Sequence, residues 1–207
     1  MVEDLGKNKV QPLVPYEFDV VAMAASAGGL MALSEVLSFL PIDFPAGILI
    51  VQHLDPHRRS LLADILKRRT ALTVKEAREG DLIQGGQVFI APPDRHLLVN
   101  PGGTLSLSQS ELVHFVRPSA DLLFESVAAS YRKRAIAVVL SGTGNDGAMG
   151  VQAIKKMEGT VIVQDQKTSE FFGMPGAAIK TGDVDFILPV EKISVILIQL
   201  VMRGEKT

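Results

Sequence analysis

Short apolar segments without polar alternation constrain the fold of this chain more than any other feature. They are FDVVAMAA, AGILIVQH, AIAVVLS, GTVIVQD and VDFILP. Strands with one solvated face alternate apolar and polar residues, whereas strands buried on both faces are apolar throughout. Helical patterns such as GLMALSEVLSFL and SLLADILKRR separate the segments. The alternation predicts an α/β fold: a doubly wound, mostly parallel sheet with helices on both faces.

Two regions depart from this alternation of strands and helices. Residues from about 72 to 118 hold the short segments LTVKEA, QVFIAPP, HLLVN and TLSLSQ between Gly and Pro turns, which predicts a small antiparallel hairpin extension, either as an insertion or at the edge of the sheet. Residues 1–17 contain Pro12 and Pro15 and few apolar residues, so we expect an N-terminal arm or linker remnant there. Residues 18–207 then form one domain, which suits a chain of 207 residues.

Composition excludes several classes of function. The chain has no cysteine, which removes thiolate catalysis and Cys-based metal sites. Its net charge of −2 gives no general attraction to nucleic acid. The N-terminus lacks the features of a signal peptide, and the longest apolar stretches are too short to span a bilayer. We therefore expect a cytoplasmic protein that neither inserts into membranes nor binds nucleic acid.

Three chemically active residues follow three of the buried strands. Ser26 lies at the turn in AASAGG, His53 ends IVQH, and Asp146 lies in the SGTGNDG loop. Ligands of open α/β sheets bind beyond the carboxyl ends of the strands, so we expect these side chains to lie together. A histidine can activate a serine as nucleophile, and a carboxylate can orient that histidine. Amides at the helix start after Ser26, at Ala27 and Gly28, could stabilise an oxyanion.

Each of these residues also has a structural interpretation. Ser26 and Asp146 are residue types that commonly cap helices, and a single histidine is more often structural than catalytic. Their shared placement at strand ends favours catalysis. The common α/β-hydrolase fold is disfavoured, because its triad runs Ser, Asp, His and because Ala24 replaces the first glycine of its G-x-S-x-G elbow.

The loop also offers a nucleotide-binding alternative. Gly142, Gly144 and Gly147 form a G-x-G-x-x-G pattern between a predicted strand and a predicted helix. Asp165 follows Gly147 by 18 residues, close to the spacing of a ribose-binding acid. Asp146 argues against this alternative, because its charge inside the loop would repel a pyrophosphate.

A metal site and a basic surface were the other candidates. His53 and His57 are four residues apart, but Pro56 interrupts any helix that would pair them, so neither a metal nor another cofactor is predicted. Basic residues cluster just beyond, and such clusters are usually solvated, although an acidic partner helix could dock there. They are Arg58, Arg59, Lys67, Arg68 and Arg69.

Seven motifs together resemble the catalytic domain of the CheB-type chemotaxis protein-glutamate methylesterases. They are ASAGGL, IVQHLDP, IAPPDRHL, RPSADLLFESVA, LSGTGNDGAMG, VQD and FFGMPGAAI, in the family's order between about residues 18 and 190. The resemblance implies that Ser26 is the nucleophile, His53 the general base and Asp146 the orienting acid. The implied reaction is hydrolysis of γ-glutamyl methyl esters on the cytoplasmic helices of methylated chemoreceptors, with release of methanol. Some family members also deamidate glutamines.

The sequence departs from the family pattern at two positions near the site. Ala24 replaces a usual glycine, and Thr143 stands near the oxyanion where the stand-alone enzymes typically carry methionine. The GTG sequence is most similar to the versions fused to receptor methyltransferases. No receiver domain fits into residues 1–17, so we expect constitutive activity or regulation in trans by a receiver domain or a methyltransferase. A catalytically silent module that binds receptor or signalling helices remains an alternative.

Overall fold

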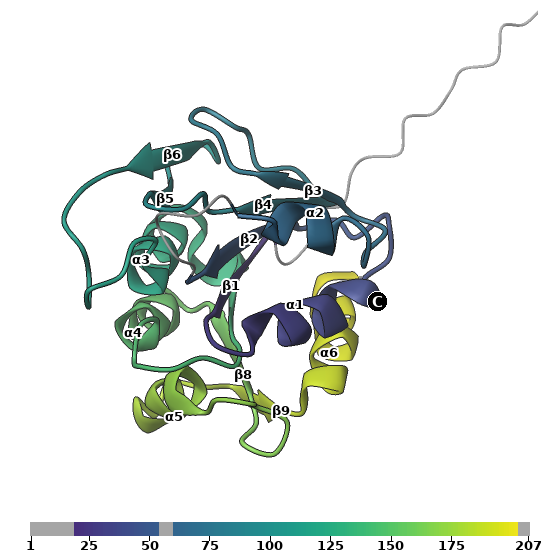
Figure 1. Ribbon diagram of the computed structural model, residues 1–207, viewed down its shortest axis with the longest axis vertical. Coiled ribbons are helices and arrows are strands. Elements are labelled where there is room, and N and C mark those ends of the chain that lie inside the picture. The colour runs from purple at the N-terminus through teal and green to yellow at the C-terminus, as the bar shows by residue number, and fades with distance from the viewer. Residues whose placement is uncertain (1–18, 54–59, 203–207) are drawn as a thin grey trace, which may run out of the picture.

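Seven strands form one parallel sheet in this computed structural model, which describes residues 19–53 and 60–202. Their order is β3-β4-β2-β1-β7-β8-β9, and every neighbouring pair is parallel. The bounds are β1 Val20–Ala25, β2 Gly47–Gln52, β3 Thr73–Glu76, β4 Gln87–Ile90, β7 Ala135–Val139, β8 Thr160–Gln164 and β9 Phe186–Leu188. The doubly wound parallel sheet is therefore confirmed (Figure 1). The predicted arm at residues 1–17 lies outside the described residues.

Helices cover both faces of the sheet (Figure 1). One layer holds α1 (Gly29–Ser38), α2 (Leu62–Leu66) and α6 (Val190–Met202), and the other holds α3 (Ala120–Tyr131), α4 (Ala148–Lys156) and α5 (Gly173–Lys180). A short 3₁₀ turn, Arg132–Arg134, follows α3. Among the described residues, no helix is both long enough and apolar enough to cross a membrane.

Strand β1 shows why the strands are apolar throughout. Val21 and Met23 pack in the core beneath α1, α2 and α6, whereas Val20, Ala22 and Ala24 pack in the core beneath α3, α4 and α5. All of them are fully buried. A strand with a hydrophobic core on each side has no position for a polar side chain, which explains the continuous apolar run.

The predicted small antiparallel extension is confirmed. It consists of β5 (His96–Val99) and β6 (Leu105–Ser108) alone. Strands β3 and β4 also lie within residues 72–118, but they extend the main sheet in parallel. The polar alternation of β3 arises because it is the edge strand, where Val74 is buried but its neighbours Thr73 and Lys75 are not.

The helix predicted from the segment SLLADILKRR is shorter in the structure than this segment. Only Leu62–Leu66 is α-helical. The amides of Arg68 and Arg69 bond to the carbonyls of Ile65 and Leu66, three residues back, so the chain tightens into a turn.

The order of the strands locates the functional edge. Strand β1 pairs with β2 on one side and with β7 on the other, although β2 to β6 all intervene between β1 and β7 in the chain. The connections lead away from β1 and β7 in opposite directions, which makes this a topological switch point. The crevice beyond the carboxyl ends of such strands is where open α/β sheets bind ligands.

Candidate active site

The three residues predicted from strand ends all lie at this edge. Ser26 directly follows β1, His53 directly follows β2, and Asp146 lies in the loop between β7 and α4. The His53 amide donates to the Ala25 carbonyl at 3.1 Å, so β1 and β2 stay paired up to the site. On the other side, the Ser26 amide donates to the Ser141 carbonyl at 3.0 Å. Ser26 is thus held between the ends of two neighbouring strands.

His53 and Asp146 form a direct pair. His53 Nε2 lies 2.9 Å from Asp146 Oδ2, and the side chains are 13% and 4% exposed. An ionised carboxylate only accepts hydrogen bonds, so Nε2 carries the proton. In the neutral ring, Nδ1 then carries no proton and can accept a hydrogen bond. Within the described part of the chain, no hydrogen bond joins Ser26 Oγ to His53, and catalytic contacts of this kind are often loose without a ligand.

The N-terminus of α3 stabilises the charge of Asp146. Oδ1 accepts from the Ser119 hydroxyl at 2.8 Å and from the Asp121 amide at 3.2 Å, and Oδ2 accepts from the Ala120 amide at 2.6 Å. Burial alone would raise the pKa of the Asp146 carboxyl, but the bonds from His53, Ala120, Ser119 and Asp121 outweigh it and lower the pKa. Asp146 therefore stays ionised and holds the proton on Nε2.

Asp121 is a second buried carboxyl beside the first. Its Oδ1 accepts from the Gly150 amide at 2.7 Å. Its Oδ2 lies 3.2 Å from His114 Nε2 but outside hydrogen-bond geometry. Burial raises the pKa of Asp121, the charge of Asp146 raises it further, and the Gly150 amide and His114 only partly oppose this.

The two carboxyls give opposite pH dependences of stability. Asp146 has a lowered pKa. Its favourable contribution to the free energy of unfolding is therefore present above the ordinary pKa of 3.8 and is lost as pH falls through the folded-state pKa. Asp121 has a raised pKa, so the folded state is favoured below 3.8 and loses that advantage as pH rises through the folded pKa.

We therefore expect Asp121→Asn, which mimics the protonated acid and keeps the acceptor for Gly150, to stabilise the fold more at neutral pH than near pH 3.8. Urea unfolding of both proteins at the two pH values measures the difference. A stabilisation that is equal at both, or larger in acid, would contradict the raised pKa.

Three amides at the site are free to bind an anion. Among the described residues, the amides of Ala27, Gly28 and Thr143 donate no hydrogen bond. Gly28 caps α1 with φ of 72° in the left-handed region, and a Cβ there would approach Ser141 Oγ to 2.7 Å. Only glycine fits this turn, and the free amides of Ala27 and Gly28 directly follow Ser26 in the chain.

The glycine-rich loop packs against Ser26. A Cβ on Gly142 would lie 3.0 Å from Ser26 Cβ and 2.3 Å from Met174 Sδ, so a glycine permits this close approach. Asp165, the candidate ribose acid, uses Oδ1 to accept from the amide and hydroxyl of Thr168 at 2.9 and 2.7 Å. Both observations favour a strand-to-helix turn that supports the site over a phosphate-binding loop.

Of the other histidines, His96 supports the site from the protein interior. His96 is fully buried: Nδ1 accepts from the Ser119 amide at 3.1 Å and Nε2 lies 3.0 Å from the Glu111 carbonyl. It thus fixes Ser119, which in turn contacts Asp146. His57 lies outside the described residues, and within those residues no three His, Asp or Glu side chains gather as metal ligands.

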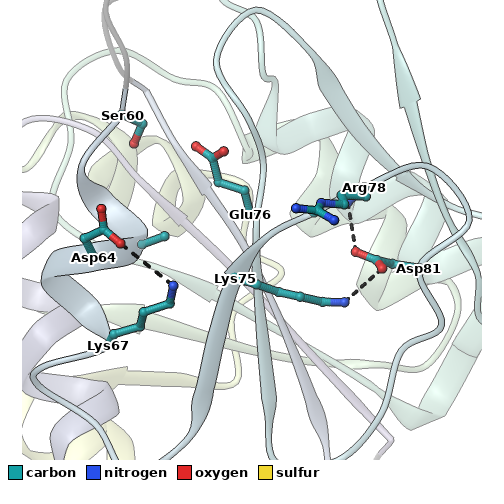
Figure 2. A pocket seen from close by; sticks show the side chains of 9 residues that line it. Ser60, Asp64, Lys67, Lys75, Glu76, Arg78 and Asp81 are labelled. Atoms are coloured by element: carbon teal, nitrogen blue, oxygen red, sulfur yellow. Dashed lines mark hydrogen bonds and ion pairs between the residues drawn. The ribbon is translucent and has the colours of Figure 1, made fainter.

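The basic cluster is only partly described, because Arg58 and Arg59 lie outside the described residues. Lys67 lines a pocket of about 500 Å³ between α2 and β3, together with Ser60, Ala63, Asp64, Lys75, Glu76, Ala77, Arg78 and Asp81 (Figure 2). Its two lysines have acidic partners: Lys67 lies 3.8 Å from Asp64 and Lys75 lies 2.8 Å from Asp81. The pocket contains neither Ser26 nor His53.

Three supporting residues were not identified from the sequence. Ser119 lies in the RPSADLLFESVA motif, to which no role in the site is assigned above; it caps α3 and also donates to Asp146. Ser141 lies two residues beyond β7, just before the glycine loop, which was a usable signal, because the predicted site residues also follow buried strands. Gln52 precedes His53 and is buried, and a polar residue inside an apolar strand was a second signal.

Comparisons with known proteins identify the family of this chain. The CheB methylesterase family model matches residues 21–197. The protein-glutamate methylesterase/protein-glutamine glutaminase of Pyrococcus horikoshii is 41% identical over 202 residues, which cover 95% of this chain and 55% of that protein. A similar enzyme of Symbiobacterium thermophilum is 39% identical over 185 residues, 89% of this chain and 51% of that protein. The chain thus spans about half the length of these relatives.

A solved structure shows the same fold. The CheB methylesterase catalytic domain of Thermotoga maritima matches with a TM-score of 0.86 and 39% identity, covering 89% of this chain and 99% of that one. A match at this level, together with a family model that spans most of the sequence, identifies the lineage as well as the architecture. The chain belongs to the CheB methylesterase family.

Proposed function

We propose that this protein hydrolyses γ-glutamyl methyl esters on the cytoplasmic helices of chemoreceptors, with Ser26, His53 and Asp146 as its triad. The observation that carries the proposal is the 2.9 Å pair between His53 Nε2 and Asp146 Oδ2, at the same edge of the sheet as Ser26 and at its switch point. The names of the relatives support the substrate class and add glutamine deamidation, for which the same residues would serve.

In the proposed reaction, Ser26 Oγ attacks the ester carbonyl while His53 Nδ1 takes its proton. Asp146 stabilises the resulting imidazolium through Nε2. The free amides of Ala27, Gly28 and Thr143 bind the tetrahedral oxyanion. The C–O bond then breaks, and methanol leaves with the proton from His53. Water, activated by His53, hydrolyses the acyl-enzyme and regenerates Ser26 and a free glutamate.

The test is release of methanol from a receptor cytoplasmic fragment that carries methylated glutamates. We expect one methanol for each methylated glutamate that is converted to free glutamate. Tight binding of the fragment without methanol would overturn the proposal in favour of a silent binding module. A thermal shift with nucleotides, but no ester cleavage, would instead revive the nucleotide-binding alternative.

A further inference from the structure

Ser141 is a buried serine with no place in the reaction above. It is 1% exposed and lies two residues beyond the end of β7. Its hydroxyl donates to the Ala27 carbonyl at 2.9 Å and accepts from the Phe171 amide at 3.0 Å. Its own amide donates to Gln164 Oε1 at 2.8 Å, and its carbonyl accepts from the Ser26 amide. Ser141 therefore ties the ends of β1, β7 and β8 together.

Gln52 contacts the same turn from β2. Its Nε2 donates to the Ser26 carbonyl at 2.7 Å and to the His53 carbonyl at 3.2 Å. Its Oε1 is buried and has no hydrogen-bond partner in the described part of the chain. A buried acceptor without a hydrogen-bond partner destabilises the folded state, so Gln52 is poorly explained as a stabilising residue.

The bonds to these two carbonyls determine where two amides point. A peptide unit is planar and trans, so its C=O and the following N–H point in opposite directions. Fixing the Ala27 carbonyl therefore fixes the direction of the Gly28 N–H. Fixing the Ser26 carbonyl in the same way fixes the Ala27 N–H. These are two of the free amides at the site.

We infer that Ser141 and Gln52 are positioning residues that aim the Gly28 and Ala27 amides at the oxyanion. The inference rests on the proposed esterase function and adds the side chains that preorganise its anion-binding turn. Preorganised donors act mainly on the transition state, so losing one lowers kcat more than it raises KM.

The test compares three substitutions. Ser141→Ala removes the bond to the Ala27 carbonyl, and we expect kcat to fall about 10- to 100-fold with KM changed less than about threefold. Gln52→Met keeps most of the side-chain volume, removes the unsatisfied oxygen and frees the Ser26 carbonyl from Nε2. We expect it also to lower kcat, while leaving the urea midpoint unchanged or higher.

Ser126→Ala is the matched control. The Ser126 hydroxyl also accepts from one amide, that of Val99 at 3.0 Å, and donates to one carbonyl, that of Leu123 at 2.8 Å, but it lies between α3 and β5. We expect Ser126→Ala to lower stability without changing kcat.

The outcomes separate this inference from the proposed function. If the unmodified protein releases no methanol, the esterase proposal and this inference are both overturned. If it does, and Ser141→Ala or Gln52→Met changes kcat no more than Ser126→Ala, or changes only KM, the positioning role alone is overturned. Should Ser141→Ala not fold, Gln52→Met still decides the question.

Discussion

Ser26→Ala is expected to lower methanol release by roughly 10⁴-fold or more, because loss of the nucleophile removes the acylation step itself. The fold should be unaffected. Within the described residues, Ser26 Oγ makes no hydrogen bond, whereas the backbone of Ser26 is held by the Ser141 carbonyl and by Gln52. We therefore expect a free energy of unfolding within about 0.5 kcal/mol of the unmodified protein. Methanol assays and urea unfolding measure the two quantities.

Ser38→Ala is a suitable control for this experiment. Ser38 lies at the opposite end of α1, is exposed, and donates to the Glu35 carbonyl at 2.9 Å. The Ser38→Ala variant should retain full turnover. If Ser26→Ala kept more than a tenth of the original turnover, Ser26 would not be the nucleophile and the proposed mechanism would be wrong.

Asp146→Asn is expected to damage both catalysis and stability. The carboxylate accepts hydrogen bonds at both oxygens, and an amide can replace only one of them. If Nδ2 takes the place of Oδ2, it faces the Ala120 amide, whose nitrogen lies 2.6 Å from Oδ2 in the unmodified protein. If Nδ2 takes the place of Oδ1, it faces the Asp121 amide, whose nitrogen lies 3.2 Å from Oδ1. Either orientation sets one N–H against another, at a cost of about 1–3 kcal/mol.

The catalytic effect of Asp146→Asn should be larger still. Without the negative charge, the imidazolium is no longer stabilised, and in one of the two amide orientations His53 Nε2 also faces an N–H group, so we expect kcat to fall about 10³- to 10⁴-fold. Turnover is measured at a temperature where circular dichroism shows the variant to be folded. This separates lost chemistry from lost structure.

Asp165→Asn is the matched control, since it makes the same chemical change beside the neighbouring strand β8. Asp165 accepts from Thr168 through Oδ1 alone, and asparagine retains that oxygen. Its turnover should be unchanged. If Asp146→Asn stayed within tenfold of the original kcat at the same temperature, orientation of His53 by Asp146 would not contribute to the reaction as proposed.

Most of the fold followed from the apolar strands. Runs such as Val20–Ala25 need a core on each side, and that requirement alone indicates a parallel sheet between two helix layers. Strand β3 could not be placed in this way. At an edge, one residue such as Val74 is buried while its neighbours stay accessible, and this local pattern is the same in an edge strand and in a hairpin. Which partner it pairs with depends on contacts far away in the chain.

The residues of the candidate site that directly follow predicted strands could be identified from the sequence. Ser26, His53 and Asp146 were found because each is a reactive residue type after a buried strand. The contacts of Asp146 with the start of α3 were not found, because they depend on how that helix packs beyond the sheet. The roles of Ser141 and Gln52 were missed for another reason: they act on backbone carbonyls, and no residue pattern reveals the direction of a peptide unit.

The pairing of β1 with β7 has a consequence for the chain as it is being made. A nascent polypeptide acquires Ser26 and His53 early, but Asp146 only after β2 to β6 and α3 have been synthesised. Pairing of such distant segments comes late in folding, because closing the long loop is entropically unfavourable. Unfinished chains, or chains cut before β7, should therefore be inert, so that the proposed demethylation of receptors begins only with completed molecules.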